Sequence, residues 1–213
     1  MNIFIIILGI VGFAFAVIIH EVAHGLVAER LGDPTARLMG RLTLNPLKHI
    51  DIMGSIVLPL TLLLIRSPFL FGWAKPVPVD PYNLQHPKKD MALISLAGPL
   101  SNIVMALILS IFLRIFTVTF PHSDIFTLFI YLIQFNIALA VFNLIPVGPL
   151  DGSKIVTGLL PQKYAVKFSN ILERYGVLLI AVLILPIFGG RSLVTLIISP
   201  VINLFLKLLL INL

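Results

Sequence analysis

Long apolar runs constrain this chain more than any other feature of its sequence. A helix needs about 20 apolar residues to cross the hydrocarbon core of a bilayer. Five runs are candidates for such helices: 3–26, 91–116, 125–147, 175–188 and 193–213. Only 11% of the residues are charged, against roughly 25% in soluble domains. The sequence therefore predicts an all-α polytopic membrane protein with about five transmembrane helices, the first of them a retained helix.

The polar stretches between these runs leave no room for a second folded domain. We therefore expect a single transmembrane domain over residues 1–213. Its expected parts are a core (1–30, 91–116 and 125–152), a region of re-entrant and hairpin structure (33–90) and C-terminal helices (171–213).

Three shorter stretches have patterns of their own. Weak alternation of polar and apolar residues over 37–44 predicts a short strand or β-hairpin near the active site. The apolar run 52–65 has only 14 residues and contains Pro59, which suits a re-entrant or interfacial segment, here expected over 52–70. The basic stretch 152–174 could form an interfacial amphipathic helix.

The first apolar run ends in VIIHEVAHG, residues 17–25. On a helix, His20 and His24 share one face, one turn apart. That spacing suits two imidazoles on one zinc ion, with Glu21 beside them as a general base. Ionisable residues in a membrane helix are functional candidates by default. The alternative is that the histidines bond to neighbouring helices and the glutamate pairs with an arginine.

A catalytic zinc ion needs a third protein ligand and an open position for water. The candidate is Asp151, which follows Pro146, Gly148 and Pro149 at the end of an apolar run. Such residues break a helix, and broken backbone at membrane depth occurs only where it lines protein or water. The alternative is an ordinary turn at the membrane surface.

Three motifs, HEVAHG (20–25), AGPLSN (97–102) and NLIPVGPLDG (143–152), together resemble the site-2 protease family of intramembrane zinc metalloproteases. LTLNPLKHID and FGWAKPVPVDP resemble its compact prokaryotic branch, for which we expect neither a PDZ domain nor a nucleotide-sensing domain. The resemblance implies one zinc ion per chain and these site residues: metal ligands His20, His24 and Asp151, general base Glu21, and catalytic helpers Asn102 and Asn143. For Asn102 the alternative is interhelical packing beside Gly98.

The resemblance also implies the function. We expect cleavage of a peptide bond in the transmembrane segment of a protein substrate, in regulated intramembrane proteolysis. The alternative is a non-catalytic metal-binding scaffold or metal carrier in the membrane, which would not need Glu21. The expected partners are the substrate and the lipid bilayer; nucleic acid is not expected, because the basic residues are scattered rather than clustered. The sequence leaves the oligomeric state open.

The ligand positions predict a topology. His20 lies about 25 Å along its helix from Ile3, near the bilayer face where that helix ends. Asp151 reaches the same face only if the segment 52–70 dips into the bilayer and returns. With that path, 12 of 14 loop Lys and Arg residues lie on the active-site side. The positive-inside rule then predicts a cytoplasmic active site and an outside N-terminus in a prokaryotic cell membrane.

Overall fold

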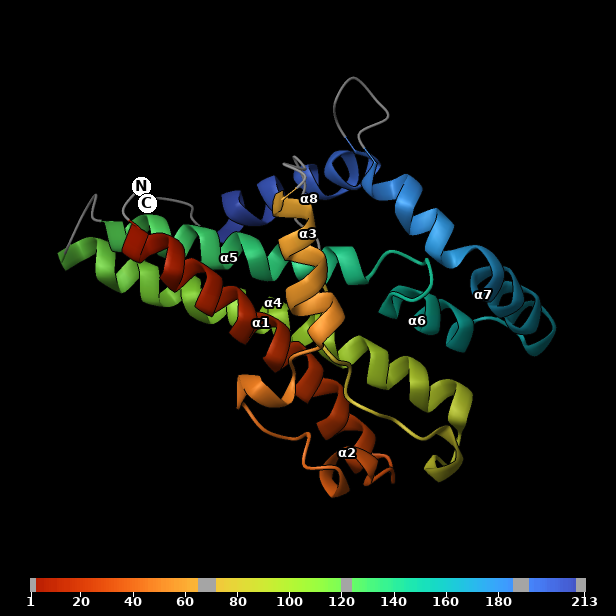
Figure 1. Cartoon of the computed structure of the whole chain (residues 1–213). Helices are drawn as coiled ribbons and strands as arrows, with labels where there is room; N and C mark the ends of the chain where they lie inside the picture. Colours follow the sequence, from red (N-terminus) through yellow and green to blue (C-terminus); the bar gives the residue numbers. More distant parts are fainter. Residues whose placement is uncertain (1–2, 65–71, 120–123, 186–191, 210–213) are drawn as a thin grey trace.

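The computed structural model describes residues 3–64, 72–119, 124–185 and 192–209, and this part of the chain is helical with no assigned strand. Figure 1 shows the arrangement of the helices. The α-helices are α1 (Ile3–Arg30), α2 (Thr35–Leu38), α3 (Leu58–Leu64), α4 (Pro87–Thr119), α5 (Asp124–Asn143), α6 (Asp151–Leu159), α7 (Gln162–Ile184) and α8 (Leu193–Leu209). Short 3₁₀ turns η1 (Pro46–Lys48) and η3 (Pro81–Asn83) and a π-helical segment η2 (Ile52–Val57) complete the described structure.

Helices α1 and α4 run in opposite directions and pack against each other. Near the end of α1, Ala28 packs with Ile94 close to the start of α4. Farther back along α1, Ala16 accepts a hydrogen bond from Asn102, which lies farther along α4. The second half of α1 therefore meets the first half of α4.

Helix α5 packs beside both and runs in the same direction as α1. A Cβ at Gly12 would meet the side chain of Leu132, and the Phe13 and Phe135 rings lie edge to face with centroids 5.5 Å apart. The order of these contacts is the same along both helices. The end of α5 therefore lies at the end of the bundle toward which α1 runs (Figure 1).

Among the described residues, three helices are long and apolar enough to cross a membrane: α1, α4 and α5. Helix α8 is apolar but shorter, and α7 combines a polar first half with the apolar run from Tyr175. The predicted count of five crossings is therefore not confirmed. The predicted amphipathic stretch 152–174 is helical, but it divides between α6 and the first half of α7.

The direction of α8 also differs from a five-crossing arrangement. The backbone carbonyl of Leu209, at the end of α8, accepts a hydrogen bond of 2.9 Å from Arg114 near the end of α4. Leu209 and Phe126, near the start of α5, pack on the same apolar cluster. The end of α8 thus lies where α1 begins, whereas an odd number of crossings would put it at the opposite end.

The predicted strand or hairpin over 37–44 is wrong. Residues 35–38 form α2, and the chain then turns at Gly40, whose φ of +62° favours glycine. The start of α2 is fixed by Asp33, whose carboxylate accepts from the backbone N–H of Thr35. A weak alternation over eight residues does not outweigh these turn-forming contacts.

The run that begins at Ile52 is a single helical stretch that joins η2 to α3. The Asp51 carboxylate accepts from Gly54 N at its start, and the stretch ends at Leu64. Its 13 residues extend about 20 Å, which is less than the roughly 30 Å of a bilayer core. Residues 65–71 lie outside the described residues, so the re-entrant path over 52–70 stays a prediction.

Candidate metal centre

Three buried side chains from two helices meet inside the molecule. His20 and His24 come from one face of α1, and Asp151 is the first residue of α6. Asp151 Oδ2 lies 3.0 Å from His20 Nε2 and 3.2 Å from His24 Nε2. One ligand atom from each residue lies within 4.8 Å of the other two, so the structure brings together all three of the metal ligands expected from the sequence.

The broken backbone after α5 delivers Asp151 to the histidines. The helix ends at Asn143, and the chain passes through Pro146, Gly148 and Pro149 before α6 begins. A Cβ at Gly152 would lie 2.3 Å from the carbonyl oxygen of Leu144. Only glycine therefore permits α6 to start directly against the end of α5, beside the histidines.

Hydrogen bonds behind the imidazoles fix their orientation. His24 Nδ1 lies 2.6 Å from the carbonyl oxygen of Ile94, which can only accept, so this nitrogen carries the proton. His20 Nδ1 lies 2.6 Å from Asn102 Oδ1. The Asn102 amide nitrogen donates to Ala16 O and to Asn136 Oδ1, so its oxygen is the atom left to accept from His20. In a neutral ring, Nε2 of each histidine then presents a lone pair toward Asp151.

The donor set fits a zinc ion. Two imidazole lone pairs and a carboxylate oxygen at these distances repel one another unless a cation lies among them. Three such ligands with a fourth position open to water are typical of catalytic zinc.

Gly98 on α4 makes room for the imidazoles. A Cβ at this position would lie 2.5 Å from His24 Nε2 and 2.6 Å from His20 Nε2. Helix α4 thus passes directly beside the nitrogens that would bind metal. The packing also explains why the AGPLSN motif carries glycine one turn before Asn102.

Glu21 lies next to His20 but outside the ligand set. Its side chain is half-buried, and its Oε2 accepts a hydrogen bond of 2.9 Å from the backbone N–H of Val77. The extended segment that contains Val77 is far from α1 in the sequence, so the fold alone brings this donor to the carboxylate.

The two expected helper asparagines have different surroundings. Asn102 is fully buried, and its hydrogen bonds go to His20, Ala16 and Asn136, so it contributes to the centre through His20. Asn143 is half-buried at the end of α5 and donates to Leu139 O one turn earlier; its helper role stays a prediction. Sequence reasoning missed Asn136, although a buried polar residue in an apolar run is a signal.

We expect Gly98→Ala to lower zinc occupancy severely, because the added methyl group would fall on the two metal-binding nitrogens. Zinc per chain in the purified protein, measured by mass spectrometry of the metal, checks this. Gly9→Ala is the matched control, since a Cβ at Gly9 meets nothing within 4 Å. Normal occupancy in Gly98→Ala would contradict the arrangement of α4 beside the histidines.

We expect Asn102→Ala to weaken zinc binding by roughly 10- to 100-fold, the usual effect of losing the partner that orients a histidine ligand. Competition with a chelator of known affinity measures the change. Ser110→Ala is the control, because Ser110 is also buried on α4 but donates to Leu107 O, away from His20. Equal affinities in the two variants would show that Asn102 does not support the centre.

Comparisons with known proteins agree with this site. The family model of Peptidase family M50 matches residues 114–183, which include Asp151. YwhC of Bacillus subtilis, named as a zinc metalloprotease, is 36% identical over 182 residues, which cover 80% of this chain and 77% of YwhC. Rip2 of Mycolicibacterium smegmatis, named likewise, is 31% identical over 150 residues, covering 70% of this chain and 55% of Rip2.

A more distant relative comes from an archaeon. The zinc metalloprotease MJ0392 of Methanocaldococcus jannaschii is 26% identical over 178 residues, which cover 83% of this chain and 41% of MJ0392. No solved structure matches the chain at a significant level. The extent and identity of the match to YwhC, together with the family model, show that this chain belongs to peptidase family M50, the site-2 protease family of zinc metallopeptidases.

Proposed function

We propose that this chain is an intramembrane zinc metalloprotease that hydrolyses a peptide bond in the transmembrane segment of another membrane protein, in regulated intramembrane proteolysis. One observation carries the proposal: a buried set of two histidines and an aspartate adjoins a glutamate within a bundle of membrane-length helices. The family supplies the reaction class. The site and the helix lengths together suggest where the reaction takes place.

The proposed roles follow from the positions of the side chains. His20, His24 and Asp151 would hold zinc, which supplies a Lewis acid that polarises the scissile carbonyl and activates water. Glu21 takes the proton from the attacking water and passes it to the leaving amine. Asn102 keeps the His20 ring in the tautomer that binds metal through Nε2.

A transmembrane substrate has to reach the site with its backbone exposed. A helical backbone hides its carbonyls in hydrogen bonds, so a transmembrane substrate must unwind locally before cleavage. A cavity of about 800 Å³ lies between α4, α6 and α7. Its lining includes Gly148, Pro149 and Ser153, which are close to Asp151 in the sequence, but not His20, Glu21, His24 or Asp151 themselves. We infer that this cavity receives the unwound stretch.

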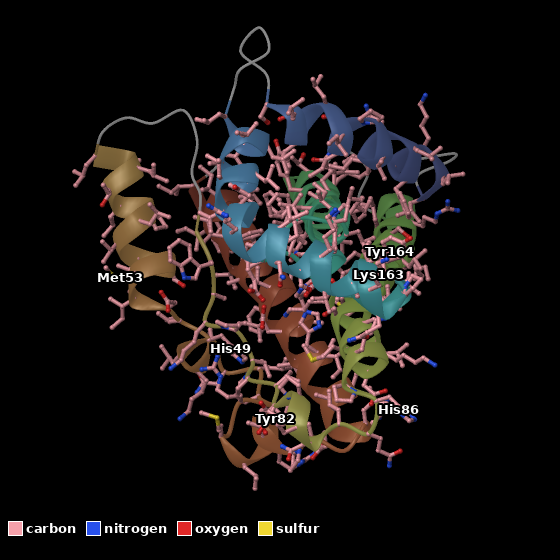
Figure 2. All side chains as sticks on the ribbon, turned by 90° about the vertical axis from the view of Figure 1, so that its right-hand side faces the viewer. His49, Met53, Tyr82, His86, Lys163 and Tyr164 are labelled. Carbon is pink, nitrogen blue, oxygen red and sulfur yellow. The ribbon has the colours of Figure 1, made fainter. Side chains whose placement is uncertain are left out.

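We propose that the active site faces the cytoplasmic side of a prokaryotic cell membrane and that the N-terminus lies outside. The parallel course of α1 and α5 supports an active site on one side of the membrane, because Asp151, which follows the end of α5, then meets the histidines in the second half of α1. Figure 2 views the end of the molecule where α4 begins; His86, Lys163 and Tyr164 lie there. The sequence puts 12 of 14 loop Lys and Arg residues on the active-site side in this arrangement, which the positive-inside rule associates with the cytoplasm.

We expect Glu21→Gln to keep one zinc ion per chain and to lose cleavage, because the amide cannot take a proton from water. The assay is cleavage of a panel of single-span substrates in detergent, with wild type and variant loaded to equal zinc content. General-base loss typically costs 10²- to 10⁴-fold in rate. Equal cleavage by both proteins would remove Glu21 as the base, and a wild type that binds zinc but cuts nothing would favour a metal carrier.

The chain has no cysteine. A thiol reagent therefore labels only a cysteine that is introduced, and its reaction shows on which side of the membrane that position lies. We expect Tyr82→Cys and Lys163→Cys to react with an impermeant maleimide only after the cell membrane is opened, because both positions would face the cytoplasm. Both are exposed in the structure. Labelling of either position in intact cells would contradict the proposed orientation.

A further inference from the structure

Residues 73–80, here called the strap, form an extended segment that crosses from η2 to η3 and passes His49 (Figure 2). Its backbone is tied to several parts of the molecule. Trp73 N donates to Gly54 O, and Lys75 N donates to His49 O at 2.8 Å. A proline at 76 and another at 78 stiffen the segment.

The far end of the strap is anchored by Asp33, in the loop after α1. Asp33 Oδ2 accepts from Asp80 N at 2.8 Å, and its Oδ1 accepts from the Asn83 side chain. Burial would raise the pKa of Asp33, but hydrogen bonds from Thr35, Asn83 and Asp80 lower it below the ordinary value. The carboxylate is therefore ionised at neutral pH and holds the strap against the end of α1.

Between these anchors the strap touches the active-site helix. The Val77 side chain is buried, and its Cγ1 would be 2.9 Å from a Cβ at Gly25, one turn beyond Glu21. The Val77 N–H donates to Glu21 Oε2 at 2.9 Å. Packing and hydrogen bonding thus place one strap peptide on the side chain that acts as the general base in the proposed function.

Arg41 binds the other end of that same peptide. Its Nη2 donates to Pro76 O at 3.2 Å and to Lys75 O at 2.7 Å. Pro76 O and Val77 N belong to one peptide group. The Arg41 guanidinium therefore donates to the carbonyl of this peptide, and the Glu21 carboxylate accepts from its N–H. Hydrogen bonds in such a chain polarise one another. The positive charge of Arg41 therefore strengthens the donor that holds Glu21.

The burial of Arg41 calls for such a role. The residue is only 7% exposed, and buried arginines are rare unless their charge is compensated. Its hydrogen bonds go to carbonyls rather than to a carboxylate. Among these contacts, the negative charge closest to that of Arg41 is the Glu21 carboxylate. One peptide group separates the two side chains.

We propose that Arg41 is a positioning residue for the general base. It acts through the peptide between Pro76 and Val77, which holds Glu21 Oε2 and leaves Oε1 to take the proton from water. This inference rests on the proposed function for its catalytic consequence, but the three-part contact can be tested without any cleavage. A purely structural role for Arg41 would instead affect folding or zinc binding and would not single out Glu21.

The first test is independent of activity. In protein labelled with ¹⁵N-valine, we expect the Val77 amide to exchange slowly with solvent, and at least tenfold faster in Arg41→Met and in Glu21→Ala. Arg41→Lys, which keeps the charge and a donor, should retain part of the protection. Unchanged Val77 exchange in Arg41→Met would overturn the inference, even if wild type cleaved no substrate.

The second test uses cleavage kinetics with zinc content measured in each variant. Val77→Pro removes the N–H in a segment that already has proline on both sides. We expect it and Arg41→Met to keep zinc and to lower kcat roughly 10- to 100-fold, the scale of a misplaced catalytic group, with KM within about twofold. Val79→Pro is the matched control and should keep the wild-type kcat.

Two outcomes of the second test would reject the inference. A normal kcat in folded, zinc-loaded Val77→Pro would show that the peptide does not connect Arg41 to Glu21. Loss of zinc in Arg41→Met would make Arg41 a structural residue of the metal centre. If wild type itself cleaves nothing while the Val77 exchange behaves as expected, the proposed function fails and the contact through the strap stands.

Discussion

The fold depends on keeping a polar cluster satisfied inside an apolar helix bundle. An unpaired polar group in hydrocarbon costs several kcal/mol, so His20, His24 and Asp151 can exist there only with partners. The partners come from three other helices: the Ile94 carbonyl and Asn102 from α4, Asn136 from α5, and Asp151 from α6. The same contacts hold the helices together, so structure and metal site cannot be separated.

Close approach of backbones makes this arrangement possible. Gly98 brings α4 against the imidazoles, and Gly152 brings α6 against the end of α5. Small residues play this part in many membrane proteins, because no hydrophobic driving force exists between helices that already lie in lipid. Here the two glycines have a second consequence: they set the distance between ligands that come from helices far apart in the sequence.

The region between α1 and α4 has a role that its predicted form did not suggest. It contains no strand among its described residues, yet it delivers Arg41, Asp33 and the strap to the open side of the active-site helix. A stiff, proline-containing segment is suited to this task, because it loses little conformational entropy when it is fixed. One end of the bundle thus carries the ligands, and this region completes the surroundings of Glu21.

The sequence by itself determined the three membrane-length helices α1, α4 and α5, the two histidines on one helix face, and the break that leads to Asp151. These features are local: they depend on run length, on a spacing of four residues, and on Pro and Gly. Only the tertiary structure decided that Asn102 supports His20, that Asn136 fixes the Asn102 amide, and that Val77 meets Glu21. It also set the direction of α8, which depends on contacts between residues far apart in the chain that no local pattern contains. The strand expected over 37–44 failed for a local reason, because the turn contacts at Asp33 and Gly40 outweigh a weak alternation.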